Sequence, residues 1–140
     1  MKLKKYLLFC LIFTVVTGCN RYSADYLTTR NFLSASGSWR IYKYNDNGTN
    51  KTKNMNGYKL VFSPNNVLTY SSGDNSYNGY WNTSESNDRK GVLSLGFYAD
   101  NEMQDISDSW VVTKQRPGKI WLESKNVAIG EDDVLILKKN

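Results

Sequence analysis

The sequence predicts an all-β fold, an antiparallel up-and-down eight-stranded barrel preceded by a short N-terminal helix or tether. Eight short runs rich in Tyr, Trp, Val, Ile and Leu follow one another from Gly37 onward, each bounded by Gly, Asn, Asp or Ser. Apolar and polar residues alternate within most of these runs. No long helical segment interrupts them, which favours antiparallel neighbours joined by turns. Eight strands can close into a barrel that is just filled by its own side chains or holds one small ligand.

The first 18 residues have the three parts of a secretory signal. Lys2, Lys4 and Lys5 give a basic start, an apolar run extends from Tyr6 to Val16, and small residues follow it. This run has about 11 residues, whereas a membrane-spanning helix needs roughly 20. We therefore expect residues 1–18 to be a signal peptide rather than a transmembrane anchor.

The stretch Val16-Thr17-Gly18-Cys19 resembles the lipobox of bacterial lipoproteins. The resemblance implies that the Cys19 thiol receives a diacylglyceryl group, that the signal is cut before Cys19, and that the new amine is acylated. Several acyl chains, at about 0.8 kcal/mol per buried CH₂, would make the anchor effectively permanent. Asn20 after the cysteine and the lack of an acid-rich tract beyond it imply a periplasm-facing protein of the outer membrane.

Composition limits the chemistry of the mature chain. The whole sequence has a net charge of +5, but without the three signal lysines 15 basic residues stand against 13 acidic ones, which gives +2 and does not indicate a nucleic-acid partner. Cys10 would be lost with the signal, Cys19 would carry lipid, and the chain has no His. General acid–base and nucleophilic catalysis depend most often on such residues. We therefore expect a protein that is not an enzyme and has no cofactor, metal or catalytic residue.

We expect residues 19–36 to form a lipid-anchored tether, a short helix, or both. Tyr22, Tyr26 and Leu33 have roughly helical spacing, and Ser23 or Thr28 would suit the helix start. A disordered stalk that holds the domain away from the membrane is the alternative.

Residues 37–140 form the predicted barrel domain. Its eight expected strands are Ser38–Tyr44, Gly57–Ser63, Asn66–Ser71, Tyr77–Asn82, Gly91–Phe97, Ser109–Lys114, Lys119–Ser124 and Asp133–Lys138. Turn residues separate them, for example Asp46-Asn47-Gly48, and Pro117-Gly118 in the order that a type II turn requires.

Alternation assigns faces to several of these strands. Tyr58, Leu60 and Phe62 share one face, and a second set of Leu93, Leu95 and Phe97 lies opposite Ser94 and Gly96. Trp110 and Val112 share a face with Lys114, whereas the last strand is apolar on both faces and is expected to be covered on both.

The strand pattern lapses over Tyr98 to Asp108. Met103 and Ile106, with Tyr98 as a further contact, suit a single helical turn across one barrel mouth, so this segment is a candidate lid. Its acidic residues match no calcium-binding loop spacing, and we interpret them as part of a solvated loop.

The pattern Gly-x-Trp occurs twice, as Gly37-Ser38-Trp39 and Gly79-Tyr80-Trp81, where glycine permits close backbone approach and the indole fills the barrel floor. The first copy is similar to the opening strand of lipocalins and other calycin-type barrels. Together with Gly57-Tyr58-Lys59-Leu60-Val61-Phe62 and Lys119-Ile120-Trp121-Leu122, it resembles the small lipocalin-like lipoprotein domain of Bacteroidetes and Flavobacteria. That family implies a barrel fold but no settled activity. No Thr-Asp-Tyr stretch is present, and Lys138 stands where the last lipocalin strand often has Arg, so a standard lipocalin pocket is not implied.

Three functions are open on the sequence. The first is binding of a small hydrophobic or amphipathic ligand inside the barrel, with the candidate interior residues Trp39, Tyr58, Leu60, Phe62, Trp81 and Trp110. The second is a protein- or glycan-binding or inhibitor module that uses an outer aromatic face, because Tyr42, Tyr44, Tyr70, Tyr77 and Tyr80 either alternate outward or line a mouth. The third is a purely structural lipoprotein, in which such tyrosines only stabilise the sheet as cross-strand pairs.

Overall fold

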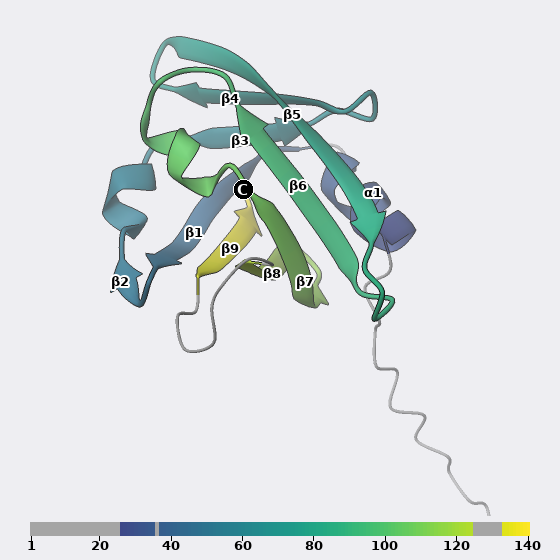
Figure 1. Cartoon of the computed structure of the whole chain (residues 1–140). Coiled ribbons are helices and arrows are strands. Elements are labelled where there is room, and N and C mark those ends of the chain that lie inside the picture. The colour runs from purple at the N-terminus through teal and green to yellow at the C-terminus, as the bar shows by residue number, and fades with distance from the viewer. Residues whose placement is uncertain (1–25, 36, 125–132) are drawn as a thin grey trace, which may run out of the picture.

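The computed structural model describes residues 26–35, 37–124 and 133–140. Within these ranges, nine antiparallel strands form one sheet, and the pairing of β1 with β9 closes eight of them into a barrel (Figure 1). The predicted fold is therefore confirmed. The strands are β1 Trp39–Asp46, β2 Thr49–Asn50, β3 Lys59–Phe62, β4 Val67–Ser72, β5 Asn75–Glu85, β6 Gly91–Phe97, β7 Ser109–Arg116, β8 Lys119–Ser124 and β9 Val134–Lys139; the helices are α1 Tyr26–Ser34 and the 3₁₀ turns η1 Thr52–Met55 and η2 Glu102–Ile106.

The strand that sequence reasoning missed is β2, a two-residue partner of β1 that lies outside the barrel. Asn47 and Gly48 both have positive φ, 48° and 73°, as a tight two-residue hairpin turn requires. A strand of two residues is too short to show alternation, so only its Asn-Gly turn was visible in the sequence.

The helix α1 covers one end of the barrel, and we call this end the helix end (Figure 1). The Trp39 indole Nε1 donates to the Leu33 carbonyl at 3.2 Å, and the ring centroids of Phe32 and Trp39 lie 5.1 Å apart. The Trp81 Nε1 donates to the Ser63 carbonyl at 2.9 Å at the same end. Both Gly-x-Trp tryptophans are buried in this floor, as predicted, and Tyr26–Ser34 form the predicted short helix.

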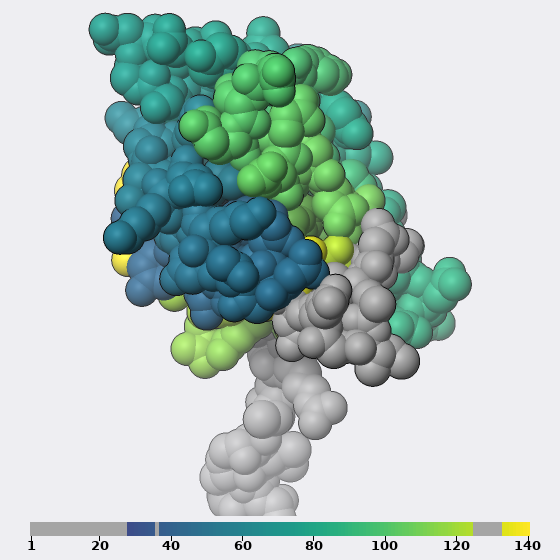
Figure 2. Space-filling view, turned by 60° about the vertical axis from the view of Figure 1, so that its left-hand side comes forward, coloured from purple at the N-terminus to yellow at the C-terminus, as the bar shows by residue number. Residues whose placement is uncertain are grey.

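The opposite end is covered by η1 and η2, which lie next to each other on the surface (Figure 2). Met55, Met103 and Ile106 project from these turns and are buried. The Asn101 side chain accepts a hydrogen bond from the Met103 N–H at 3.1 Å and starts η2. The predicted lid over this mouth is confirmed for Met103 and Ile106, but Tyr98 lies outside it with 69% of its surface exposed.

Two register shifts change the faces that simple alternation predicts. In β1 the shift lies between Ile41 and Lys43, and it turns Tyr44 into the core, where only 2% of its surface is exposed. In β7 the shift between Val112 and Lys114 turns Lys114 outward, away from the buried Trp110 and Val112. The expectation that Lys114 shares their face is therefore wrong.

The predicted signal peptide at residues 1–18, Cys19 and the tether residues 19–25 lie outside the described residues. None of the helices in the described ranges is long and apolar enough to span a membrane.

Candidate binding surfaces

A cluster of buried side chains occupies the barrel interior. Of the six residues predicted to face a ligand, Trp39, Leu60, Phe62, Trp81 and Trp110 are buried in the core, and Tyr58 packs against it half-buried. The Phe62 and Trp81 rings meet edge to face with centroids 5.2 Å apart. The structure brings the six residues into one cluster, and their role in ligand binding stays a prediction.

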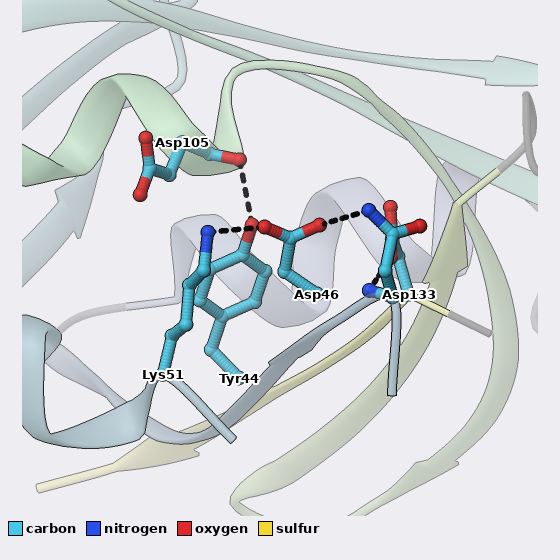
Figure 3. Close-up of polar contacts among 6 residues, drawn as sticks. Tyr44, Asp46, Lys51, Asp105 and Asp133 are labelled. Atoms are coloured by element: carbon cyan, nitrogen blue, oxygen red, sulfur yellow. Dashed lines mark hydrogen bonds and ion pairs between the residues drawn. The ribbon is translucent and has the colours of Figure 1, made fainter. Parts of the chain in front are cut away.

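The lid is held by the polar tips of aromatic side chains that come from the barrel. The Tyr44 hydroxyl donates to the Asp105 carbonyl at 2.9 Å, as Figure 3 shows, and the Trp110 Nε1 donates to the Ile106 carbonyl at 3.0 Å. The Tyr58 hydroxyl donates to the Glu102 carboxylate at 3.0 Å, and the Tyr70 hydroxyl accepts from the Ala99 N–H at 3.2 Å. Four aromatic side chains, three of them buried in the core, therefore fasten the segment that closes the barrel.

Burial and these contacts raise the pKa values of two tyrosines at the end of the barrel that η1 and η2 cover, which we call the lid end. Burial, with smaller contributions from Asp46 and Asp105, raises the pKa of Tyr44 well above its ordinary value. Burial first and the hydrogen bond to Glu102 second raise the pKa of Tyr58 to about 12. Both phenols therefore stay protonated and donate at neutral pH.

The acidic residues of this end have structural partners. Asp46 pairs with Lys51, and Asp133 accepts from the Asn47 N–H at 2.7 Å, so these side chains tie β1, the β1–β2 turn and β9 together (Figure 3). Asp108 accepts from the Ser124 hydroxyl and from the Ser109 N–H, both at 2.7 Å. Among the described residues, no group of three or more acidic, His or Cys side chains is placed to hold a metal ion.

An aromatic platform lies outside the barrel on β5 and β6. Tyr80 is paired with Gly96 across these strands, and a Cβ added at Gly96 would lie 1.9 Å from the Tyr80 Cε1. The Tyr80 ring therefore occupies the space above Gly96 that a side chain would fill. The Tyr98 ring lies beside it, with centroids 6.0 Å apart and planes inclined by 36°. Both rings are open to solvent, with 47% and 69% of their surfaces exposed.

A polar groove of about 420 Å³ adjoins this platform. It is lined by Tyr80, Asn82, Ser94, Leu95, Ser107, Asp108 and Ser109. The Ser94 and Ser109 hydroxyl oxygens lie 3.1 Å apart, and the Asn82 side chain is exposed. An exposed ring face is thus placed next to amide, hydroxyl and carboxylate groups.

The five tyrosines considered for an outer face divide between the two sides of the sheet. Tyr42 and Tyr80 point outward. Tyr44 and Tyr70 are buried and reach the lid, and Tyr77 stacks on Tyr70 with centroids 5.3 Å apart, a cross-strand pair of the kind that stabilises a sheet. Sequence reasoning missed Tyr98 and Asn82 as surface groups of the platform. The sequence does mark this region, because Ser94 and Gly96 are small residues on the outer face of β6 and leave room there for a neighbouring side chain.

A second, mainly apolar cleft of about 450 Å³ lies between α1 and the β7–β8 turn. Its described lining residues are Phe32, Gln115, Arg116 and Pro117. The Thr29 hydroxyl lies 3.5 Å from the Gln115 side-chain oxygen and bridges the helix to β7.

Comparison with known proteins supports the fold. No protein-family model and no curated protein matches the sequence. Among solved structures, the barrel is similar to a DUF4847 family protein from Bacteroides vulgatus ATCC 8482, with a TM-score of 0.54 and 11% sequence identity. The match covers 79% of this chain and 96% of that chain. At this identity the likeness shows a shared fold, and membership in the lipocalin-like lipoproteins of Bacteroidetes stays a prediction.

Proposed function

We propose that this chain is a lipid-anchored protein of the bacterial envelope that binds an uncharged glycan on its outer β5–β6 face. The lipobox-like stretch at Cys19 and the short apolar run before it support the anchor, with the domain facing the periplasm from the outer membrane. We propose binding rather than catalysis, because the sequence lacks His and its two Cys residues lie in the leader and at the lipidation site.

The observation that carries the glycan proposal is the placement of Tyr80 over Gly96. A ring that rests on a strand loses little conformational freedom when a ligand stacks on its outer face. Tyr98 enlarges the platform, and the polar groove beside it offers hydrogen-bonding groups for sugar hydroxyls. An apolar face bordered by polar groups matches a pyranose ring, which has C–H bonds on its faces and hydroxyls at its edge.

The test uses the full chain, purified in detergent, in calorimetric titrations with neutral linear oligosaccharides: cellohexaose, xylohexaose, maltohexaose and chitohexaose. We expect at least one of them to bind, and the double variant Tyr80→Ser/Tyr98→Ser to bind it roughly tenfold more weakly, since an aromatic contact contributes about 0.5–1.5 kcal/mol. Tyr42→Ser, which removes an exposed tyrosine from another face, is the matched control. Binding that survives the double variant, or no binding by any of the four sugars, would overturn the proposal.

The cleft beneath α1 favours a second candidate, binding of a small amphipathic ligand at the barrel mouth rather than among the packed interior residues. Its volume lies in the range of small-molecule sites, and Phe32 and Pro117 supply apolar surface while Arg116 supplies a cation for an acidic head. A ligand in the interior would first have to displace buried side chains such as Trp39 and Leu60. Fluorescence competition with laurate tests the cleft: Arg116→Gln should weaken laurate binding and leave oligosaccharide binding unchanged.

A further inference from the structure

Four cations form a row across four neighbouring strands at the helix end of the barrel. Arg40 of β1 is directly paired with Lys138 of β9, Lys138 with Lys119 of β8, and Lys119 with Arg116 of β7. We call these four residues the cationic row. Like charges directly opposite each other on adjacent strands destabilise a sheet, so the row costs folding free energy. No carboxylate in the described ranges forms an ion pair with any of the four.

Two aromatic rings adjoin the row and stabilise the cations. The Lys119 Nζ lies 4.0 Å from the Tyr42 ring centroid and 4.9 Å from that of Trp121. Lys138 and Arg40 also approach the Tyr42 ring, at 5.6 and 5.9 Å. This surface therefore combines positive charge with aromatic side chains, and Tyr42 keeps 46% of its surface exposed.

The row lies at the end of the domain where the N-terminal segment joins it. The Lys139 N–H donates to the Gly118 carbonyl at 2.8 Å, and the Asn140 N–H donates to the Ser38 carbonyl at 2.9 Å, so the start of β1, the end of β9 and the β7–β8 turn meet there. α1 covers this same end. The carboxylates Asp46, Glu102, Asp105 and Asp133 lie at the opposite end with η1 and η2. The described domain is therefore electrically polarised along the barrel, with its positive end on the side of the predicted anchor.

We propose that the cationic row, with Tyr42 and Trp121, docks on the anionic lipid headgroups of the membrane that holds the anchor. This inference rests on the proposed lipidation of Cys19. Seven residues, 19–25, precede α1, and seven extended residues span at most roughly 25 Å, so the tether keeps the helix end close to the headgroups. Basic residues are attracted to an anionic leaflet, and Trp and Tyr side chains suit the headgroup level. Docking would offset the repulsion within the row and orient the β5–β6 platform relative to the membrane.

The test reconstitutes the full, lipidated chain into phosphatidylcholine vesicles with and without phosphatidylglycerol, using brominated phosphatidylcholine as a quencher of tryptophan fluorescence. Trp121 reports on this face, because Trp39, Trp81 and Trp110 are at most 1% exposed whereas Trp121 is half-buried. The anchor holds the protein on both kinds of vesicle, so a difference in quenching between them measures docking alone. We expect quenching with phosphatidylglycerol at low salt, and its loss in high salt, which shortens the screening length to a few ångströms.

Two charge-matched variants make the test specific. Lys119→Gln/Lys138→Gln should lower the equilibrium constant for docking roughly thirtyfold, because each basic residue near an anionic surface strengthens binding by roughly a factor of five. It should also raise the melting temperature at low salt, since it removes like-charge pairs. Lys51→Gln/Lys53→Gln removes the same charge at η1, on the opposite end of the barrel, and should dock normally. Trp121→Phe should abolish the quenching signal.

Equal quenching on both vesicle types would overturn the docking proposal. A second result would also overturn it: soluble polyphosphate protects Trp121 from quenching by aqueous acrylamide, and phosphatidylglycerol vesicles do not. The cationic row would then bind a soluble polyanion. The intact mass of the same protein preparation reports separately on the anchor. A Cys19 without lipid would contradict the proposed lipoprotein, whatever the fluorescence shows.

Discussion

A methyl group added at Gly79 should destabilise the barrel strongly, whereas the same change at Gly96 should not. The Cβ of Gly79→Ala would lie 2.2 Å from the Gly96 carbonyl oxygen, a backbone atom fixed in the β5–β6 ladder. Relief requires the two strands to separate. Overpacking costs about 1–3 kcal/mol, and each weakened hydrogen bond adds about 1 kcal/mol, so we expect a loss of about 3 kcal/mol of unfolding free energy. That is a large part of the stability of a domain.

At Gly96 the obstacle is a side chain instead. The added Cβ would meet the Tyr80 ring, which is exposed and can rotate into solvent. Gly96→Ala also gains a few tenths of a kcal/mol because it restricts the unfolded chain, so its net effect on stability should stay within about 1 kcal/mol. Its consequence is functional, because the displaced ring no longer presents a fixed face to a glycan.

Urea unfolding of the two variants, followed by tryptophan fluorescence, gives the free energies, and oligosaccharide titration gives the binding. We expect Gly79→Ala to lower the urea midpoint with little change in slope, and Gly96→Ala to keep the midpoint but bind more weakly. Equal midpoints for both variants, or wild-type binding by Gly96→Ala, would refute the assigned roles of the β5–β6 contact and the Tyr80 platform.

Three further predictions concern the two ends of the barrel. Ile106→Ala should lower the unfolding free energy by about 2–4 kcal/mol, because Ile106 is buried in the lid; a loss below 1 kcal/mol in urea unfolding would show that the lid contributes little. Since the pKa of Tyr58 is raised to about 12, its contribution to stability is present below pH 10 and is lost as the pH rises through 12. Tyr58→Phe should therefore flatten the decline of stability over that interval, and an unchanged pH profile would contradict this. Arg30→Gln removes hydrogen bonds to the Pro64 carbonyl and the Asn66 side chain and the stacking over Trp81, so α1 should detach more readily; faster proteolysis within α1, at an unchanged cleavage rate in the lid, is the expected result.

The strand pattern could be predicted because buried and exposed positions alternate along most of the barrel. All eight predicted runs became strands, since residues such as Leu60, Phe62, Leu93 and Leu95 must reach one shared core. The Gly-x-Trp repeats likewise identified the two tryptophans of the floor. Both predictions rest on local patterns that the fold leaves intact.

The two departures from simple alternation have one physical cause, a local change in the period of the chain. The irregularity in β1 exchanges the faces of the residues that follow it, so Tyr44 is buried although Tyr42 is exposed. The same effect in β7 turns Lys114 out of the face that Trp110 occupies. Nothing in the order of polar and apolar residues marks either position.

The surface sites were harder to predict because they depend on which strands become neighbours. Arg40, Arg116, Lys119 and Lys138 are scattered over about a hundred positions of sequence, and only the closure of β1 on β9 places them in one row. Tyr98 joins Tyr80 in the same way through the pairing of β5 with β6.

Nuclear magnetic resonance of the amide groups distinguishes recognition on the outer β5–β6 face from recognition inside the barrel. Titration of the isotopically labelled full chain with the oligosaccharide that binds best should shift the amide signals of Tyr80, Asn82 and Ser94. The signals of Leu60 and Leu122, which face the interior, should stay in place. Shifts confined to the interior residues, with the β5–β6 face unchanged, would show that the glycan does not bind at the Tyr80 platform.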